Sequence, residues 1–600
     1  MNKYELKNRS EIAANDKWNL EAMYPAEEKW NQDLSTALKE SEEFTTLKGT
    51  ITDSSTNLLN ALNLYATIMR KAEHAFVYSR MRHDEDNANT KYTEMNNKSL
   101  STLAQISANV SFFTPELLEA DENIIKGYIE ETPQLKEYEF MLDSILLSKP
   151  HVLSSDEERI IAQLNESASA PDEIFTMFND ADLSFGKVKN EDGHDVELTH
   201  GNYIQFMESE NREVRKNAFE AMYGRYKEFN NSISMMYNYN VKHDTIMSNL
   251  RSYESTLDRA LSGERIPLSV YDNLIDAVHK SLTSMHKYME IRKRALGVND
   301  LRMYDVYRPI VRPEGLECTY DDAVEIACKA LAPLGDEYVS TLRKGLTEER
   351  WVDIYENKGK TSGAYSFGSY DSYPYILMNF SGELRDVFTL VHEAGHSMHS
   401  YYTRKTQPFI YGGHSIFTAE VASTVNETLL IHYLLKNAES AEMKKYLINF
   451  YIDEFKSTLF RQTMFAEFEK IAHEIVENGG SLTSEILNNE YDKLNTAYYG
   501  PAVEHDDFIK YEWSRIPHFY RAYYVYQYAT GYSAANAISN RILNGGPSER
   551  DEYLKFLTSG ESDYPIELLK ISGVDMSTEE PVLSALSTFE KLVNELDKMM

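Results

Sequence analysis

The sequence predicts a mainly α-helical fold with one small β-sheet, and three observations lead to this prediction. Apolar side chains recur at spacings of three and four residues over long segments, for example residues 57–83 and 443–479, as expected of amphipathic helices. Residues 359–380 interrupt this pattern with glycine, serine and tyrosine and then become apolar and β-prone. The segment His-Glu-Ala-Gly-His at residues 392–396 follows within a renewed helical pattern.

Glycines and polar stretches mark the ends of the predicted elements. The helical pattern of residues 443–479 ends on Gly479 and Gly480, a typical helix stop. Residues 185–200 are polar and contain two further glycines, which indicates a β-hairpin more than a linker. We place a boundary there and expect an N-terminal helical region over residues 1–200 and a second helical region over residues 201–600.

The composition is that of a globular protein with a sizeable core. The chain has 600 residues, of which 42% are hydrophobic and 12% aromatic. It has no run of 18 apolar residues and no N-terminal apolar stretch, so we expect neither a membrane span nor a signal peptide. Only two cysteines occur, Cys318 and Cys328, which fits a reducing compartment. We therefore expect a cytoplasmic protein.

The net charge argues against two classes of partner. It is −34, from 95 acidic and 61 basic side chains, and no run of lysine or arginine is visible. Nucleic acid and anionic lipid need a basic surface. The sequence therefore predicts no nucleic-acid partner and no membrane partner.

The segment that breaks the helical pattern predicts short strands. Gly363 and Gly368 mark turns, and the residues after them are β-prone. Such a strand can pair with an extended peptide through main-chain hydrogen bonds, which tolerate many side chains. We expect this role for four consecutive residues, Tyr375, Ile376, Leu377 and Met378.

The His-Glu-Ala-Gly-His segment predicts a metal site on a helix that Ser381 caps. His392 and His396 are four residues apart, so both imidazoles project from one helix face and can share one metal ion. Glu393 would lie beside the metal rather than on it. This position suits a general base acting on a water molecule that the metal activates.

A catalytic zinc ion needs three protein ligands and one open position, so one more ligand is required. Glu420, His414 and His399 are the candidates. His399 follows His396 by only three residues, which makes convergence on one ion awkward. Glu420 opens a second helix, and an antiparallel course would bring it to both histidines, so we favour it. Glu427, two turns further on the same face, is expected to orient a ligating histidine.

Three segments around this motif resemble oligoendopeptidase F, a branch of the thimet-oligopeptidase-like metallopeptidases. They are GAYSFGSYDSYPYILMNF, DVFTLVHEAGHSMHS and SIFTAEVASTVNETLL. The resemblance extends upstream through residues 251–275 and 303–310 and covers roughly residues 110–590. It is most specific around the histidine motif.

The resemblance implies a fold, a cofactor and a substrate class. The fold is a two-lobed helical metallopeptidase with a deep central channel and a small β-sheet beside the motif helix. An oligopeptidase F-type N-terminal domain is implied at roughly residues 115–185, and residues 201–600 become the catalytic domain. One zinc ion per chain is held by His392, His396 and Glu420. Short unstructured oligopeptides are the implied substrates.

A tyrosine-rich stretch is the expected second half of the site. Residues 516–532 contain His518 and six tyrosines, and such a stripe on a helix is usually core. Peptide hydrolysis also creates an oxyanion that needs a preorganised donor, which a phenol supplies. The resemblance implies that His518 and then Tyr523 and Tyr526 face the zinc ion. We favour Tyr526 as the oxyanion donor, with Tyr523 as the alternative.

Taken together, the sequence predicts a zinc-dependent endopeptidase that cuts internal bonds of short peptides. Two alternatives remain. A metallocarboxypeptidase on the same scaffold needs a group for the terminal carboxylate, and no arginine stands out for that role. A non-catalytic helical peptide-binding protein would not need the complete set of His392, Glu393, His396 and Glu420.

Overall fold

The computed structural model describes residues 6–312 and 318–600 and divides the chain into two compact units. Unit 1 comprises Met1–Lys149, Gly315–Lys436 and Ile538–Val574. Unit 2 comprises the three stretches Pro150–Glu314, Asn437–Ala537 and Asp575–Met600. The single boundary expected near residue 200 does not coincide with a change of unit, because helices distant in the chain pack within the same unit.

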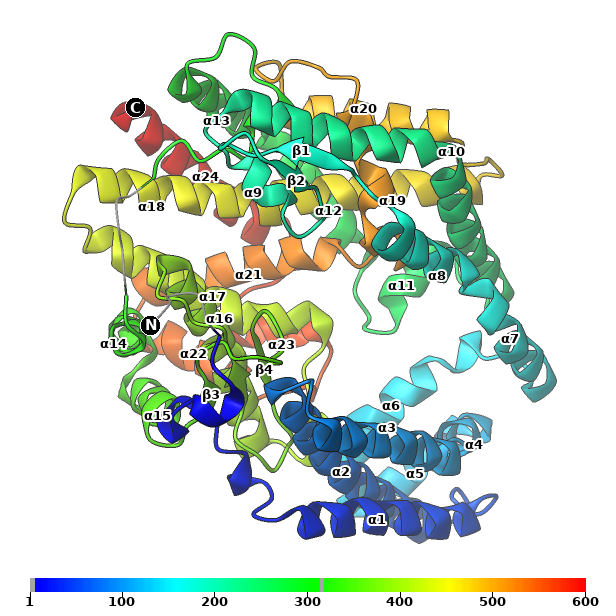
Figure 1. Ribbon diagram of the computed structural model, residues 1–600. Helices are drawn as coiled ribbons and strands as arrows, with labels where there is room; N and C mark the ends of the chain where they lie inside the picture. Colours follow the sequence, from blue (N-terminus) through cyan, green and yellow to red (C-terminus); the bar gives the residue numbers. More distant parts are fainter. Residues whose placement is uncertain (1–5, 313–317) are drawn as a thin grey trace. The chain divides into compact units, whose positions relative to one another are not determined.

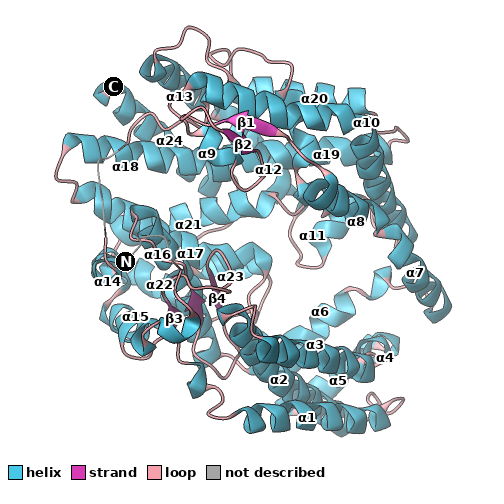
Figure 2. Ribbon diagram, viewed as in Figure 1, coloured by secondary structure: helices cyan, strands magenta, loops and turns pink. Residues whose placement is uncertain are grey.

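The prediction of a mainly helical chain with small sheets is confirmed (Figure 2). The helices of unit 1 are α1 (Glu27–Phe44), α2 (Ser55–Glu85), α3 (Thr90–Val110), α4 (Phe113–Glu119), α5 (Glu122–Glu131), α6 (Glu139–Leu147), α14 (Tyr320–Ala330), α15 (Asp336–Thr347), α16 (Leu384–Thr406), α17 (Ile416–Lys436), α22 (Pro547–Leu557) and α23 (Pro565–Ile571). Helix α2 contains the helix expected over residues 57–83.

The N-terminal part of unit 1 is a helical bundle (Figure 1). The side chain of Ser54 caps α2 by accepting the N–H of Asn57, which satisfies one of the free donors of the first turn. The apolar faces of the bundle helices meet in one core that includes Phe44, Ile68 and Ile106. Burial of such side chains is the main source of stability for a bundle of this kind.

A three-stranded sheet in unit 1 consists of β3 (Val352–Asp353), β4 (Tyr365–Phe367) and β5 (Tyr375–Leu377). The strand order is β3-β5-β4, with β3 parallel and β4 antiparallel to β5. The N-terminal segment lies beside β3, where the N–H of Ile354 donates to the carbonyl of Asp16. The side chains of β5 pack on Trp18 and its neighbours. The small sheet expected before the motif helix is therefore present.

Unit 2 is also helical. Its helices are α7 (Ser155–Ala168), α8 (Ala170–Met177), α9 (Tyr203–Met207), α10 (Arg212–Leu250), α11 (Thr256–Ser262), α12 (Leu268–Lys280), α13 (Leu282–Leu296), α18 (Ala441–Glu454), α19 (Arg461–Glu477), α20 (Ser484–Tyr499) and α24 (Glu580–Met599), and α21 (Tyr526–Asn544) contributes to both units. The expected hairpin is formed by the antiparallel strands β1 (Lys187–Lys189) and β2 (Asp195–Glu197).

The long helical pattern of residues 443–479 corresponds to α18 and α19, joined by a π-helical stretch over Phe455–Phe460. The helix ends before Gly479, which adopts a positive φ of 82°. A left-handed residue at this point is a common helix ending, and glycine adopts it without steric cost. The predicted stop signal is confirmed.

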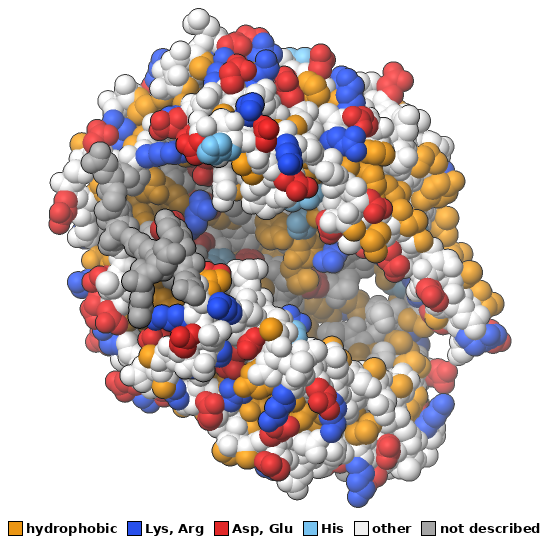
Figure 3. Space-filling view, in the orientation of Figure 1, with side chains coloured by type: hydrophobic (Ala, Val, Ile, Leu, Met, Phe, Trp, Pro, Cys, Tyr) orange, Lys and Arg blue, Asp and Glu red, His pale blue; other side chains and the backbone are white. Residues whose placement is uncertain are grey.

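The surface carries charges of both signs, interspersed over the face seen in Figure 3. Hydrophobic side chains gather over α8 and the second half of α10, where Ile174, Met177, Met235 and Tyr239 are exposed (Figure 3). Across residues 6–312 and 318–600, no helix combines the length and the apolar character that crossing a lipid bilayer requires.

Candidate metal centre

The motif helix α16 begins at Leu384, and Glu383 is its N-cap residue. The carboxylate of Asp386 accepts the backbone N–H groups of Ser381, Gly382 and Glu383. The prediction that Ser381 caps this helix is therefore wrong, because Asp386 accepts the free N–H groups. The hydroxyl of Ser381 donates to the same Oδ2 atom of Asp386. A carboxylate in this first turn is also stabilised by the helix dipole.

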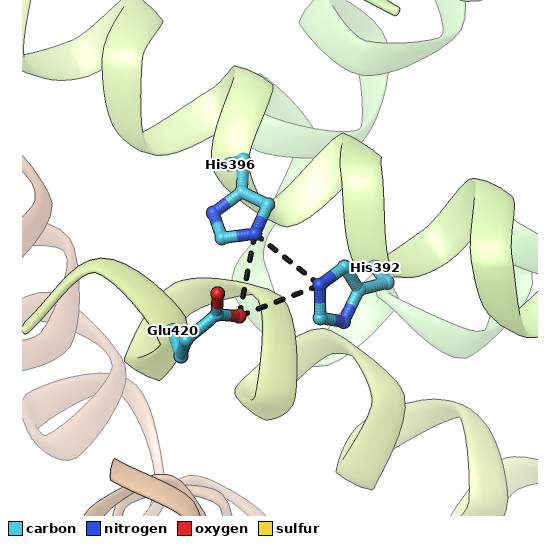
Figure 4. Close-up of side chains that lie close together, drawn as sticks. All are labelled: His392, His396 and Glu420. Carbon is cyan, nitrogen blue, oxygen red and sulfur yellow. Dashed lines mark hydrogen bonds and ion pairs between the residues drawn. The ribbon is translucent and has the colours of Figure 1, made fainter. Parts of the chain in front are cut away.

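Three side chains from α16 and α17 converge on one point (Figure 4). The Nε2 atoms of His392 and His396 lie 3.2 Å apart. The Oε2 atom of Glu420 lies 3.4 Å from each of these nitrogens. Among the residues that the structure describes, this is the one group of three or more potential ligands close enough to hold a metal ion.

This triangle fits a zinc ion. Two imidazole nitrogens and one carboxylate oxygen form a donor set typical of catalytic zinc, which binds such ligands at about 2.0–2.1 Å in a tetrahedron. The edge of a tetrahedron with these bond lengths is about 3.3–3.4 Å. The observed separations of 3.2 to 3.4 Å match that edge. The three ligand atoms thus occupy three corners of the coordination tetrahedron and leave its fourth corner for water or substrate.

The electrostatics of the triangle favour positive charge at its centre. Burial alone would lower the pKa of His392, but Glu420 and Glu427 outweigh it and raise this pKa well above its usual value. Burial alone would raise the pKa of Glu420, but the two histidines outweigh it and hold this pKa below its usual value. A bound cation would take the place of the imidazolium charge, since metal ligation requires neutral imidazole.

Residues of α17 hold the ligands in place. Ser423 donates its hydroxyl to the Oε2 atom of Glu420 at 3.0 Å, and Ser423 is fully buried. The Oε1 atom of Glu427 lies 3.3 Å from the Nδ1 atom of His392. A carboxylate at Nδ1 fixes the tautomer that leaves Nε2 free for a metal. Residues 420, 423 and 427 thus lie on the face of α17 that contacts the motif helix.

Glu393 lies beside the triangle and contributes no atom to it. Its side chain is only 7% exposed. Burial raises the pKa of its carboxyl group, which also accepts a hydrogen bond from the backbone of Ser366 in β4. A buried carboxyl group next to a metal site is suited to proton transfer, because its pKa moves toward neutrality.

The other two candidate ligands, His399 and His414, form a pair of their own. Their ring centroids are 3.6 Å apart, and the Nε2 atom of His414 lies 3.0 Å from the hydroxyl of Thr403. Burial lowers the pKa of His399 well below its usual value and that of His414 to about 3. Both rings are therefore neutral and packed together, and the structure brings Glu420 to the motif histidines instead.

The expected peptide-binding strand needs a correction. Residues 375–377 form β5, the central strand, with β3 on one side and β4 on the other. Residues Tyr375, Ile376, Leu377 and Met378 are at most 1% exposed. The N–H groups of Ile376 and Met378 already donate to carbonyls beside β3. No backbone group of β5 is left for a peptide, because tertiary pairing uses both of its edges.

The edge next to the metal centre belongs to β4. Its residues Tyr365, Ser366 and Phe367 are half-buried, and β5 is its only strand neighbour among the described strands. The hydroxyl of Ser366 lies 2.8 Å from that of Ser397 on α16. The strand is therefore fixed against the motif helix with one edge unpaired by other strands, the arrangement needed for strand addition.

The tyrosine-rich stretch lies in unit 2 and is not one continuous helix. Pro517–Tyr520 is a 3₁₀ turn and α21 starts at Tyr526. Between them Tyr523 adopts a positive φ of 56°. The helical spacing assumed across residues 516–532 is therefore wrong for its first half, because a turn at Tyr523 interrupts the helical geometry.

The tyrosines around this turn differ in accessibility. Tyr523 and Tyr526 are only 3% and 2% exposed and pack against Tyr271. Tyr524 and Tyr528 are half-buried, as is His518. The Nε2 atom of His518 lies 3.5 Å from the hydroxyl oxygen of Tyr528. Tyr524 and Tyr528 are not among the expected site residues, because the clustering of tyrosines in the sequence does not distinguish which of them are accessible.

Comparisons with known proteins agree on one family. The model of peptidase family M3 matches residues 205–588, and the model of the oligopeptidase F family matches residues 116–185. Oligopeptidase PepF of Bacillus subtilis is 44% identical, covering 99% of this chain and 89% of its own. Group B oligopeptidase PepB of Streptococcus agalactiae is 41% identical, and the match covers 99% of this chain and 98% of that protein. The crystal structure of oligoendopeptidase-F from Enterococcus faecium is 39% identical with a TM-score of 0.74, and the match covers 95% of this chain and 98% of that one.

Proposed function

The chain belongs to peptidase family M3, and from this premise we propose that it hydrolyses internal peptide bonds with one zinc ion held by His392, His396 and Glu420. It is a metalloendopeptidase that acts on oligopeptides, as its family and its relatives over nearly the whole chain indicate. The triangle of three ligand atoms with edges of 3.2 to 3.4 Å is the observation that carries the zinc assignment.

A zinc ion in this triangle would polarise the scissile carbonyl and lower the pKa of a water molecule at the open position. Glu393 would take a proton from the attacking water as it adds to the carbonyl carbon, and would deliver that proton to the amine nitrogen as the tetrahedral intermediate collapses and the C–N bond breaks. The burial of Glu393 and its place outside the ligand set support this role. Glu427 would keep His392 oriented through its Nδ1 atom.

Substrate would be bound as an extended strand along β4. The half-buried, outer position of β4 in the sheet and its contact with α16 support this proposal. Main-chain hydrogen bonds along such an edge would align the scissile bond and tolerate many sequences. Folded proteins offer few free extended segments, so short unstructured peptides are the preferred substrates.

The oxyanion would be stabilised by His518 and by a tyrosine hydroxyl of the same turn. The resemblance of residues 516–532 to the family points to Tyr523 and Tyr526. The accessible side of the turn, where Tyr528 lies 3.5 Å from His518, supports Tyr528 ahead of both. Removing one oxyanion donor costs about 10²–10³ in kcat, so comparing the Tyr523→Phe, Tyr526→Phe and Tyr528→Phe variants identifies the donor.

The zinc assignment is tested by removing and restoring the metal. Protein treated with a chelator and dialysed should lose cleavage of a peptide blocked at both ends, and one equivalent of zinc should restore it. The readouts are metal content by elemental analysis and product masses by mass spectrometry. Full cleavage by metal-free protein would overturn the proposal.

A further inference from the structure

The turn that carries His518 depends on one residue in an unfavourable backbone conformation. Tyr523 has a φ of 56°, in the left-handed region that costs free energy for any residue with a Cβ atom. Such a conformation persists only where the surroundings hold it. The contacts of Tyr523 therefore show what fixes the turn.

Glu469 of α19 makes the contact at the backbone. Its Oε1 atom accepts the N–H of Tyr523 at 2.7 Å, and Glu469 is completely buried. The phenol oxygen of Tyr523 lies 2.9 Å from the hydroxyl of Thr256. The ring packs on His473 and Tyr271, at centroid distances of 4.7 and 5.5 Å. Backbone, hydroxyl and ring are each held within unit 2.

The left-handed residue brings two short segments together. His518 lies before the turn at Tyr523 and Tyr528 after it, and their side chains approach to 3.5 Å. The ring of Tyr524 packs on both, with centroid distances of 5.9 Å to His518 and 5.5 Å to Tyr528. Tyr523 is buried, whereas its neighbour Tyr524 is half-buried. The backbone conformation of Tyr523 therefore sets the course of the chain that joins the members of this group.

We propose that Glu469 is a positioning residue whose carboxyl group holds Tyr523 in the left-handed conformation and thereby keeps His518, Tyr524 and Tyr528 together. The proposal rests on the proposed function, in which His518 and Tyr528 stabilise the oxyanion. Glu469 acts through the backbone of Tyr523 and, being buried, does not touch the substrate.

Glu469 is suited to this role in its neutral form. Burial raises its pKa to about 8, against the opposing charge of His473, which favours the protonated form at neutral pH. Within the described residues, its Oε2 atom has no hydrogen-bond partner. Glutamine has the same shape and offers the same acceptor, whereas leucine fills the space without an acceptor. Aspartate keeps the carboxyl group but withdraws it by one methylene.

These substitutions provide the test on the metal-loaded enzyme. Glu469→Gln should keep kcat within about twofold, while Glu469→Leu should lower kcat at least about tenfold with KM and metal content unchanged, because small displacements of catalytic groups are costly. Hydrogen exchange of the peptide containing Tyr523 should quicken in the leucine variant only. The exposed Glu474 on the same helix provides the control Glu474→Leu, with normal kcat.

Normal kcat in Glu469→Leu, or an equal loss in Glu469→Gln, would overturn the proposal. If the leucine variant does not fold, Glu469→Asp decides: it should show the same loss of kcat, and normal kcat would overturn the proposal. Failure of the proposed function gives a different result, since His518→Ala and Tyr528→Phe would then leave kcat unchanged. Losses in these two variants with normal kcat in Glu469→Leu would reject the role of Glu469 alone.

Discussion

Gly395 of the motif helix lies against the backbone of Ser423, so closely that a Cβ atom on Gly395 would be 2.5 Å from the Cα atom of Ser423. The carbonyl oxygen of Ala422 would be 2.6 Å away. Real Cβ atoms do not approach backbone to these distances, so only glycine permits this spacing of α16 and α17. The same close approach brings Glu420 to the two histidines.

Gly395→Ala should therefore weaken metal binding by at least about tenfold, although residue 395 is not a ligand. The added methyl group must push α17 away from α16, an overpacking change that costs about 1–3 kcal/mol, and Glu420 moves with α17. Metal affinity by competition with a chelator measures the effect. Gly127→Ala in α5 is the matched control, since a Cβ atom there meets nothing within 4 Å. Unchanged affinity in Gly395→Ala would show that Glu420 does not depend on this contact.

Glu393→Gln should retain the metal and lose nearly all turnover. Glutamine preserves the shape of the side chain but cannot take a proton from water, and general base catalysis typically contributes about 10²–10⁴ in rate. Metal content and kcat on a blocked peptide are measured on the same sample. Retention of more than a few per cent of kcat would assign the base to another group.

Glu420→Ala should lose metal on dialysis, while His399→Ala and His414→Ala should keep it. Glu420 supplies the third corner of the triangle, whereas the two other histidines pack on each other. Elemental analysis of the three dialysed variants separates the roles. One equivalent of metal in Glu420→Ala, or metal loss in either histidine variant, would contradict the ligand set proposed here.

Stability at acid pH should depend on Glu512, a buried carboxylate in unit 2. Burial alone would raise its pKa, but Arg461 and Arg515 outweigh it and hold the pKa of Glu512 below its usual value. An unfolded glutamate has a pKa of about 4.3. The unfolded state therefore binds more protons near that pH, and the contribution of Glu512 is present above pH of about 4.3 and is lost as pH falls further.

Glu512→Gln should make the free energy of unfolding less dependent on pH below about 5, and should lower it by about 3–5 kcal/mol at pH 7, because the half-buried Arg461 and Arg515 lose their buried charged partner. Urea unfolding at several pH values measures both effects. Glu490→Gln is the control, since Glu490 forms an ion pair with the exposed Lys493 and such surface pairs contribute about 0–1 kcal/mol. The same pH dependence in wild type and Glu512→Gln would contradict the assignment.

Peptides of roughly five to twenty residues should be cut at internal bonds whether or not their ends are blocked, because main-chain pairing along β4 needs neither terminus. A stable folded protein should survive the same treatment. Mass spectrometry of a blocked and unblocked peptide series gives the cleavage sites. Loss of cleavage on blocking the C-terminus would indicate a carboxypeptidase, and digestion of the folded protein would contradict selection for unstructured substrates.

The local pattern of the sequence was sufficient for the helices and for the core of the site. The periodicity of residues 57–83 predicted α2, and the four-residue spacing of His392 and His396 predicted two imidazoles on one face. Glu420 was favoured as the third ligand because an antiparallel return is the simplest course after a short connection. The first two inferences depend on the 3.6-residue repeat of the α-helix, which is a local property of the chain, whereas the place of Glu420 also depends on the packing of α17 against α16.

Tertiary structure decided the features that local periodicity does not encode. Strand residues 375–377 were recognised, but their central place between β3 and β4 depends on pairing with residues far along the chain. Tyr528 is half-buried and Tyr526 is buried, and the left-handed Tyr523 between them and His518 donates its N–H to Glu469, 54 residues away in the sequence. The spacing of α16 and α17 follows from the contact of Gly395 with Ser423. By itself the sequence determined which elements form and that His392 and His396 share one helix face, since these features depend on near neighbours. Long-range contacts decided which strand edge and which tyrosine hydroxyl are accessible.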